Sequence, residues 1–547
     1  DLSRCYNLHS KAVKFRIEST QEVLKVIMKG DWMASFDLKS AYLQVPVNKN
    51  YVQFLGFAVE REKGVKEYFR YVMMPFGLND AARVLTKLMR SPLERWRAMG
   101  IKCYIHLDDG FIFCGSKEET LEASRIVRQD LINYGLLISE SKCSWGARRS
   151  LEWTGFIFDT VGFQLWVPEA KLARAQAKLE GLLVAKSDLV CVRDLASLAG
   201  LLISFGPAMG EVVRFNTRAM MIRIAEVTEA QGWSAKIELG YRVIEELIFW
   251  KQNIVLVNGH VMRKEDRVIT AETREMFSDA SEFLLGGAQF CGDTEVLGTR
   301  YQACLLDSEV GMSSTYRELR AVEEGLKVRG SEFRGHLVRW GCDNWAAANI
   351  IRLGSMKPDC HEVAKRISQL ARQLGVQLEA FWLRRNSVQI QICDEISKDF
   401  DTSDYKLSSV DFDQLRADFG PFSADFFASS FSCQFSPFYA KLACSEAEGT
   451  DAFSVSWSKP QFGFFHPPVG LVVKVLRYAE RCSASGLLVV PDWQGSVFMV
   501  VLRDLMARRK VWLARRFRPV LQSPPWLKSR TFSGVPKFDF LAIMMDF

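Results

Sequence analysis

Residues 103–113, CYIHLDDGFIF, place two adjacent carboxylates and a glycine inside an otherwise apolar, strand-like stretch. An Asp-Gly pair between two apolar runs predicts a β-hairpin. Its acids, Asp108 and Asp109, either face water at an ordinary turn or project into a metal site. Short motifs match by chance often enough that this stretch alone favours the turn. The neighbouring segments have to decide between the two interpretations.

A further carboxylate lies upstream, in DWMASFDLKSAYLQVPV at residues 31–47. The pattern predicts an apolar strand that ends at Asp37, then a polar turn and a second extended run. An acid at a strand end together with an acid pair on a hairpin can hold two divalent cations. Such cations clamp the attacking and leaving oxygens of a phosphoryl transfer, and carboxylate oxygens suit Mg²⁺. Between these acids, MMPFGLNDAARVLTKLM predicts a Pro-Gly turn that opens an amphipathic helix.

In this order, the three segments resemble successive motifs of a reverse transcriptase palm. The resemblance implies that Asp37, Asp108 and Asp109 are the catalytic acids and hold two Mg²⁺ ions, with Mn²⁺ as an alternative. It also assigns four residues to the incoming nucleotide. These are the steric gate Tyr42, Phe76 and Gly77 in the turn beneath the nucleotide, and Lys142 beside the triphosphate as a proton donor. An ordinary exposed lysine explains Lys142 equally well.

Three positions depart from the usual palm pattern, with His106 in place of a tyrosine, Ala82 in place of a proline and Leu85 in place of a phenylalanine. None of these changes removes a carboxylate. The resemblance places basic finger residues before Asp1, so we expect a segment of a longer polyprotein with an incomplete polymerase site. Residues 1–162 are then the partial fingers and the palm. Helical periodicity in 163–268 predicts amphipathic helices, which the resemblance assigns to a thumb and connection region; an ordinary pair of amphipathic helices explains the pattern equally well.

From about Thr273, a second set of acids recurs at predicted strand and helix ends. They are Asp279, Glu318, Asp343 and Asp394. Each acid alone is more typical of a solvated surface, but four in one stretch after a polymerase favour a metal site. Their order resembles a ribonuclease H domain of retroelement type, at residues 269–402. The resemblance implies that the four acids ligate two Mg²⁺ ions, which activate a water against the RNA strand of a hybrid.

Residues 403–520 alternate apolar strands with helices, which predicts an α/β module, and 521–547 form a tail. Behind a reverse transcriptase and a ribonuclease H, this module resembles the methyltransferase-like segment of DIRS-type retrotransposons, which use a tyrosine recombinase. Where adenine methyltransferases carry an Asp or Asn, two prolines and an aromatic, this chain has His466, Pro467, Pro468 and Val469. A neutral histidine has one acceptor nitrogen, and valine has no ring to stack on a flipped base. We therefore expect a structural or nucleic-acid-docking module that does not methylate adenine.

The expected fold class is multidomain α+β and α/β. It comprises a palm with a helical thumb, a ribonuclease H-like mixed α/β domain and a degenerate methyltransferase-like α/β domain. The 547 residues exceed a single core, and the net charge of +7 permits a polyanionic partner. The 13 cysteines have no metal-ligand spacing, which fits reduced thiols inside a cell. No apolar stretch reaches the length that a membrane-spanning helix needs.

We therefore expect an intracellular RNA-directed DNA polymerase with ribonuclease H activity, in the cytoplasm, the nucleus or both. The partners that the resemblance implies are an RNA template, a DNA primer, the RNA–DNA hybrid and dNTPs. The resemblance also implies other parts of the polyprotein as partners, including a tyrosine recombinase. Two alternatives stay open: a gypsy-type polymerase, and a decayed or co-opted copy that binds nucleic acid without chemistry.

Overall fold

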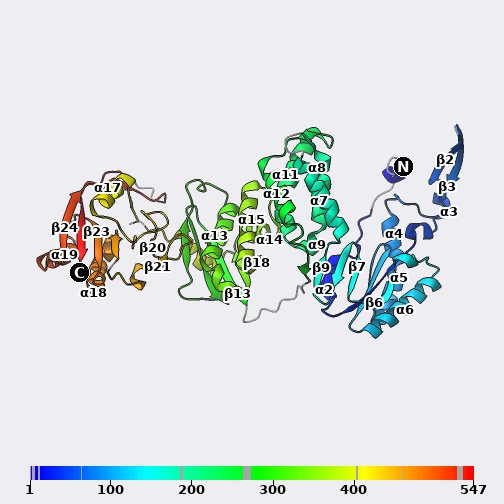
Figure 1. Ribbon diagram of the computed structural model, residues 1–547, viewed down its shortest axis with the longest axis horizontal. Helices are drawn as coiled ribbons and strands as arrows, with labels where there is room; N and C mark the ends of the chain where they lie inside the picture. Colours follow the sequence, from blue (N-terminus) through cyan, green and yellow to red (C-terminus); the bar gives the residue numbers. More distant parts are fainter. Residues whose placement is uncertain are drawn as a thin grey trace. The chain divides into compact units, whose positions relative to one another are not determined.

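The computed structural model describes residues 2, 6–9, 13–62, 64–184, 189–262, 273–401, 404–459, 461–526 and 534–547 (Figure 1). The chain divides into two compact units, Asp1–Val268 and Ile269–Phe547. Each unit mixes helices and strands, in agreement with a multidomain α/β class. No helix among the described residues is both long enough and apolar enough to cross a lipid bilayer.

A four-stranded antiparallel sheet in the order β4-β5-β1-β6 forms one core of the first unit. Its strands are β1 (Trp32–Asp37), β4 (Lys102–His106), β5 (Asp109–Cys114) and β6 (Ser144–Arg148). Both faces of β1 are covered, because Ala34 and Phe36 face one hydrophobic cluster and Met33 faces another. Because both faces are buried, the residues inside the strand are mostly apolar, and the carboxylate of Asp37 is placed at the strand end.

Three helices cover one face of this sheet: α4 (Ala81–Leu88), α5 (Arg90–Ala98) and α6 (Lys117–Asn133). The helix predicted after the Pro-Gly turn is α4. Trp96 of α5 meets Phe36 of β1 edge-on, with ring centroids 6.2 Å apart. The indole Nε1 of Trp96 also donates a hydrogen bond to Asp130 of α6, at 3.0 Å. The helices are thereby fixed to the strand that carries Asp37.

The remaining elements before residue 80 are short: α1 (Tyr6–His9), α2 (Thr20–Val26), the 3₁₀ helix η2 (Ala41–Gln44), α3 (Lys49–Val52), β2 (Gly56–Glu62) and β3 (Val65–Arg70). Strands β2 and β3 form a two-stranded antiparallel ribbon. Phe57 and Phe69 are cross-strand partners on this ribbon, and their rings stack with centroids 5.6 Å apart.

A second sheet and a group of helices complete the first unit. The sheet has the order β12-β9-β8-β7, with β7 (Ser150–Trp153), β8 (Phe156–Asp159), β9 (Gln164–Trp166) and β12 (His260–Val261). The longer helices are α7 (Glu169–Val184), α8 (Val192–Ser204), α11 (Arg218–Gln231) and α12 (Tyr241–Asn253). The shorter elements are α9 (Gly206–Met209), α10 (Val212–Phe215), β10 (Val190–Cys191) and β11 (Lys236–Ile237).

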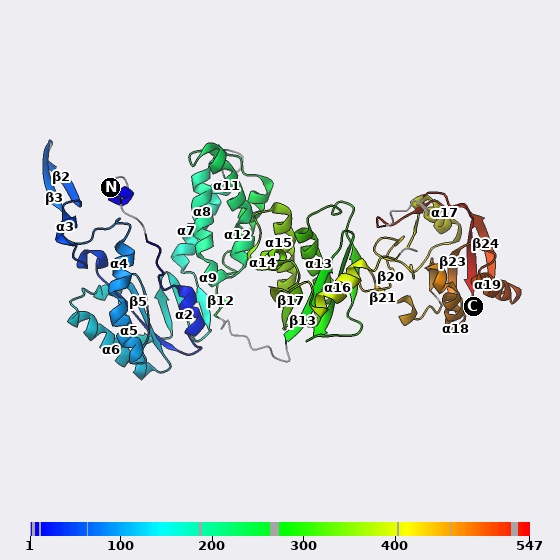
Figure 2. The same cartoon turned by 180° about the vertical axis from the view of Figure 1, so that it is seen from behind.

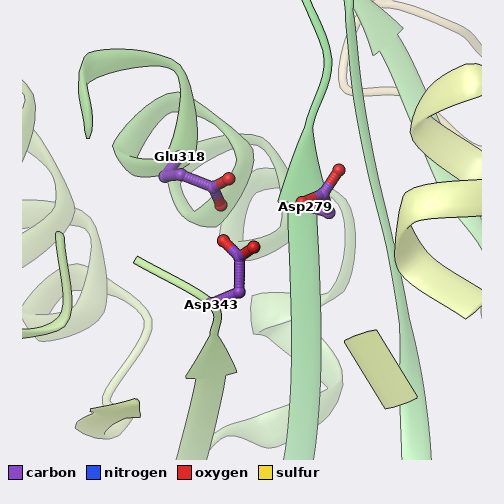
Figure 3. A group of neighbouring side chains, drawn as sticks. All are labelled: Asp279, Glu318 and Asp343. Atoms are coloured by element: carbon purple, nitrogen blue, oxygen red, sulfur yellow. The ribbon is translucent and has the colours of Figure 1, made fainter. Parts of the chain in front are cut away.

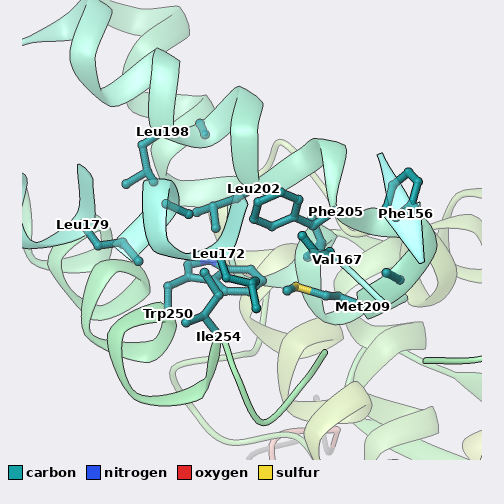
Figure 4. Packing of buried hydrophobic residues seen from close by; sticks show 14 of the residues in the cluster. Phe156, Val167, Leu172, Leu179, Leu198, Leu202, Phe205, Met209, Trp250 and Ile254 are labelled. Carbon is teal, nitrogen blue, oxygen red and sulfur yellow. The ribbon is translucent and has the colours of Figure 1, made fainter. Parts of the chain in front are cut away.

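Residues 163–268 are mainly helical, as expected, but the described segment begins and ends with a strand rather than a helix. Strands β9 and β12 pair with each other and extend the β7–β8 hairpin. Between them, α7 and α8 present apolar residues every three or four positions, which builds one buried stripe on each helix. Figure 4 shows Leu172 and Leu179 of α7, Leu198 and Leu202 of α8, and Trp250 of α12 in this shared core.

The second unit begins with a six-stranded mixed sheet. Its strands are β13 (Thr273–Ala280), β14 (Leu284–Cys291), β15 (Thr294–Glu295), β16 (Tyr301–Cys304), β17 (Leu337–Cys342) and β18 (Gln377–Trp382). The order is β15-β14-β13-β17-β18, and β16 pairs with β14. Strand β14 runs antiparallel to β13, whereas β17 and β18 run parallel to it. The carboxyl ends of β13 and β17 therefore meet at one edge of the sheet.

Helices cover both faces of this sheet. They are α13 (Ser314–Arg329), α14 (Trp345–Leu353), α15 (Pro358–Gln373) and α16 (Val388–Lys398). Met276 of β13 belongs to the cluster that α13, α14 and α15 share, while Phe277 packs with α16. Consecutive strand residues point to opposite faces, so α16 covers the face opposite to α13. Figure 2 shows these helices beside β13 and β17.

The C-terminal module contains a four-stranded sheet in the order β22-β23-β26-β24. Its strands are β22 (Phe462–Phe465), β23 (Ser485–Pro491), β24 (Val511–Phe517) and β26 (Phe540–Asp546). Helices α18 (Val472–Cys482) and α19 (Val497–Ala507) pack on one face, and α17 (Ser409–Phe419) packs on the other. The short pairs are β19 (Lys406–Leu407) with β25 (Leu521–Gln522), and β20 (Tyr439–Ala440) with β21 (Gly449–Thr450).

The expected tail at 521–547 is wrong for its last residues. Strand β26 pairs with both β23 and β24, so it is an interior strand of the module's sheet. Its residues Leu541, Ala542 and Ile543 are buried. The module therefore extends from about residue 404 to Phe547 rather than ending at 520.

Candidate functional site

Asp37 and Asp109 stand opposite each other on adjacent strands of the first unit. Asp37 ends β1, Asp109 begins β5, and the antiparallel register pairs them directly. Asp108 lies in the turn next to Asp109, and its carbonyl accepts a hydrogen bond from Leu38 N at 3.0 Å. The fold thus brings together the three acids that the sequence assigns to a polymerase site.

The hairpin between β4 and β5 is confirmed, but its turn is not at Asp-Gly. His106 pairs with Asp109, so the turn consists of Leu107 and Asp108, and Leu107 adopts a left-handed φ of 59°. Gly110 lies inside β5, where a Cβ would overlap the ring of Phe36. The glycine is required for close packing between β1 and β5 and not for the turn.

Burial and nearby negative charges raise the pKa of Asp109. Desolvation, the Asp108 charge and the contact with Asp37 together raise the pKa of Asp109 to about 6. A carboxyl in this setting resists ionisation until a positive charge comes close. Lys142 supplies one such charge at the edge of the site, since its Nζ lies 3.4 Å from Asp37 Oδ1.

Of the residues assigned to the nucleotide, Tyr42 and Lys142 lie near these acids. Tyr42, in η2, meets Phe76 edge-on with ring centroids 5.2 Å apart. Burial and the nearby Asp108 charge raise the pKa of the Tyr42 hydroxyl. Phe76 is 61% exposed, and Gly77 adopts a left-handed φ of 89°. Tyr42 therefore lies near Asp108 and carries the ring of Phe76 with it.

Sequence patterns missed one residue near the site, Glu18. Its carbonyl oxygen lies 2.6 Å from the Nδ1 of His106, and its carboxylate accepts from Ile105 N at 3.0 Å. Arg97 also donates to this carboxylate, at 2.6 Å. The segment before α2 is thus held to the end of β4, next to the hairpin. No motif indicates a contact between residues so distant in the chain.

A second acid group lies at the carboxyl edge of the β13–β17 pair. Figure 3 shows Asp279 near the end of β13, Glu318 on α13 and Asp343 directly after β17. One carboxylate oxygen of each residue lies within 4.8 Å of those of the other two. Parallel β13 and β17 bring Asp279 and Asp343 to the same edge, and α13 carries Glu318 over it.

The surroundings of this acid cluster disfavour negative charge. Burial, followed by the charges of Asp279 and Asp343, raises the pKa of Glu318 well above its ordinary value. Glu318 Oε2 is buried and has no hydrogen-bond donor among the described residues. Burial also raises the pKa of Asp279, although the Ser397 hydroxyl donates to its Oδ2 at 2.7 Å. Three acids with an unpartnered buried oxygen fit a hard divalent cation.

Asp394, the fourth expected acid, lies beside this cluster on α16 but outside the group of three. Its negative charge contributes to the raised pKa of Asp279, after burial and Asp343. Lys398, one helical turn later, places its Nζ 2.6 Å from Asp394 Oδ1. The structure therefore brings three of the four acids within shared ligand distance and leaves Asp394 paired with a lysine.

A cavity of about 740 Å³ opens in the second unit beside the expected methyltransferase-like motif. Its wall includes His466, Pro467, Pro468 and Val469, which follow β22. Burial lowers the pKa of His466 to about 4, so its imidazole is neutral at neutral pH. Aromatic residues, among them Phe427, Phe453, Trp493 and Phe538, also line this cavity.

Comparisons with known proteins identify the first part of the chain. Residues 2–158 match the family described as reverse transcriptase (RNA-dependent DNA polymerase). The enzymatic polyprotein of soybean chlorotic mottle virus is 27% identical over 129 residues, which are 23% of this chain and 18% of that protein. A retrovirus-related Pol polyprotein from transposon 297 of Drosophila melanogaster is 24% identical over 132 residues, which are 24% of this chain and 12% of that protein.

The chain thus spans less than a fifth of the length of these two relatives. Among solved structures, a foamy viral protease-reverse transcriptase in complex with an RNA/DNA hybrid is similar over 69% of this chain and 48% of its own. Its sequence identity is 12% and its TM-score is 0.41. The family match and the two relatives show that residues 2–158 are a reverse transcriptase domain of the retroelement polyprotein type.

Proposed function

We propose that the first unit synthesises DNA on an RNA template, with Asp37, Asp108 and Asp109 holding two Mg²⁺ ions. The observation that supports this most strongly is the pairing of Asp37 with Asp109 across β1 and β5, with Asp108 in the adjoining turn. Three carboxylates this close repel one another, and bound cations would relieve that repulsion.

Metal ions at this site would neutralise charge on the attacking and leaving oxygens. The chain's own side chains orient the substrates. The packed rings of Tyr42 and Phe76 present an aromatic edge beside Asp108, where it can exclude the 2′-OH of a ribonucleotide. The ammonium group of Lys142, next to Asp37, is available to donate a proton to the leaving phosphate.

Primer extension on an RNA template with Mg²⁺, using the chain in its polyprotein context, tests this proposal. Asp109→Asn should lower the rate by on the order of a hundredfold or more, because it removes one metal ligand. Asp194→Asn, on the exposed surface of α8, is the matched control and should extend normally. Equal extension by the Asp109 variant and its control would exclude the assignment.

We further propose that the sheet of β13 to β18 is a ribonuclease H domain that removes RNA from the hybrid. The cluster of Asp279, Glu318 and Asp343 supports this proposal, and we assign Asp394, whose charge acts on Asp279, as its fourth acid. Glu318→Gln should abolish cleavage of the RNA strand in an RNA–DNA hybrid. Glu282→Gln, which changes an exposed glutamate, should cleave at the normal rate. Unchanged cleavage by the Glu318 variant would remove this activity from the cluster.

Together, the two activities would copy the RNA of a retroelement into DNA and degrade the template, with an RNA template, a DNA primer and dNTPs as partners. We assign the element to the DIRS type because of the C-terminal α/β module, and a flanking tyrosine recombinase gene would test this against the gypsy-type alternative. A chain that binds template and primer but neither extends nor cleaves would instead be a decayed or co-opted copy.

A further inference from the structure

Arg385 lies at the exposed side of the acid cluster of Asp279, Glu318 and Asp343. We propose that Arg385 is a phosphate-binding residue of this cluster: it pairs with Asp343 in the cation-free protein and moves to a phosphate of the nucleic acid when divalent cations occupy the cluster. This inference rests on the proposed ribonuclease function.

The backbone around Arg385 is anchored at both ends. Before it, Leu383 N donates to Cys342 O, and the indole Nε1 of Trp382 donates to Asp343 O, both at 3.0 Å. After it, the backbone N and the hydroxyl of Ser387 both bond to Arg384 O, at 3.0 and 2.8 Å. The loop between β18 and α16 is thus tied to the strand end that carries Asp343, so the Arg385 side chain starts close to the cluster.

The contact between Arg385 and Asp343 has the features of an exchangeable pair. Arg385 Nε lies 3.3 Å from Asp343 Oδ2, and the arginine side chain is 76% exposed whereas the aspartate side chain is 15% exposed. An ion pair with one solvent-exposed partner is weak. Asp343 is also one of the three grouped acids, so a divalent cation bound there would repel the guanidinium. Cation binding should therefore release Arg385.

A released guanidinium at this place suits a nucleic-acid backbone. Its planar fork of donors matches a phosphate, which accepts two hydrogen bonds from it at once. Two exposed tryptophans lie near Asp343: Trp345, two residues later at the start of α14, and Trp382, whose indole donates to the Asp343 carbonyl. Exposed aromatic rings beside a cationic side chain are typical of surfaces that bind nucleic-acid strands.

The neighbouring Arg384 offers a matched control. It is exposed, and its guanidinium has no carboxylate partner among the described residues. The two arginines share the loop, the charge and the solvent exposure. Only Arg385 contacts the cluster, so Arg384→Gln controls for general loss of positive charge.

The first experiment measures binding of a labelled RNA–DNA hybrid to the full chain by fluorescence anisotropy. Asp109→Asn is present in every sample, so that the first unit's metal site is weakened equally. With Ca²⁺, which occupies carboxylate sites without supporting cleavage, Arg385→Gln should weaken hybrid binding by about tenfold to a hundredfold, the effect of one charge-assisted hydrogen bond. In EDTA the two proteins should bind alike, since Arg385 is then paired with Asp343. Arg384→Gln should show no such cation dependence.

The second experiment measures Mn²⁺ binding to the same proteins by calorimetry. Arg385→Gln should raise the affinity about twofold to fivefold, because the competing positive charge is gone. Arg385→Lys should keep the lower affinity of the original residue. If Arg385→Gln changes neither the Ca²⁺-dependent hybrid affinity nor the Mn²⁺ affinity, the inference is wrong. Failure of the ribonuclease proposal is seen separately, as unchanged RNA cleavage by Glu318→Gln.

Discussion

The ring of Phe36 fills the space into which a Cβ on Gly110 would project. The two residues are direct partners across β1 and β5, and each stands next to a proposed catalytic acid in sequence, Asp37 or Asp109. The bare backbone of Gly110 therefore lets the ring of Phe36 pack directly against β5, next to the strand positions that carry the acids.

Gly110→Ala should consequently lower the free energy of unfolding by about 1–3 kcal/mol, through overpacking, and impair primer extension. Urea denaturation and extension assays measure the two effects. Gly115→Ala is the control, because a Cβ there meets only Glu119 at an ordinary 4.0 Å. Adding Phe36→Leu to Gly110→Ala should restore part of the lost stability. If Gly110→Ala behaves like Gly115→Ala and wild type, the packing constraint does not exist.

Tyr42→Val should admit ribonucleotides, because the shortened side chain no longer presents an aromatic edge beside Asp108. We expect the ratio of ribonucleotide to deoxyribonucleotide incorporation to rise roughly tenfold or more, measured as the ratio of kcat/KM values. Tyr51→Val, which changes an exposed tyrosine on α3, should leave this ratio unchanged. Identical ratios for the two variants would make Tyr42 a packing residue only.

The raised pKa of Asp109 predicts a pH dependence for the cation-free first unit. The folded pKa of about 6 lies above the ordinary value of 3.8, so the folded chain binds more protons than the unfolded chain between these values. Stability should therefore fall as pH rises from about 4 to 7, and Asp109→Asn should flatten this slope. Urea denaturation in EDTA at several pH values measures it, and a slope of the opposite sign that Asp109→Asn removes would contradict the raised pKa.

Asp343→Asn should separate the two proposed activities. The two acid groups belong to different compact units, so RNA cleavage should be lost while DNA synthesis stays within about twofold of wild type. Hybrid cleavage and primer extension by one preparation measure both activities. Asp307→Asn, an exposed aspartate of the same unit, should affect neither activity. A joint loss of both activities in a folded Asp343 variant would argue against independent sites.

The C-terminal module should not methylate adenine. If the expected resemblance to adenine methyltransferases holds, His466 replaces the acid or amide that accepts a hydrogen bond from the target amine, and Val469 offers no ring for stacking. Incubation of the chain with a labelled methyl donor and adenine-containing DNA should give no transfer. Clear transfer that disappears in a His466→Ala variant would overturn this expectation.

Local sequence patterns correctly predicted the strand and the hairpin that carry the three acids of the first unit. Asp37 at a strand end and Asp108 with Asp109 on a hairpin follow from apolar runs that stop at a charge, and the structure confirms both elements. The position of the turn could not be predicted, because Gly110 owes its place to Phe36, a residue more than seventy positions away. Glu18 was missed for the same reason, since its partner His106 is distant in the chain.

The expected grouping of Asp394 with the other three acids stays a prediction, since its charge acts on Asp279 although it lies outside the group of three. One difference in the second unit depends on tertiary contacts. Strand β26 was taken for a tail, because the strands that it pairs with, β23 and β24, come well before it in the sequence.

The interior position of β26 also affects the order in which the sheets can fold during synthesis. Strands β23 and β24 flank β26 and do not pair with each other, so β23 keeps one unpaired edge and β24 has no partner in this sheet until residues 540–546 have left the ribosome. The β4–β5–β1–β6 sheet, by contrast, has all its strands once residue 148 has emerged. A nascent chain can thus carry this folded sheet before the C-terminal module is complete. Ribosomal stalling or a frameshift after residue 517 would leave β24 and one edge of the apolar strand β23 unpaired and open to aggregation.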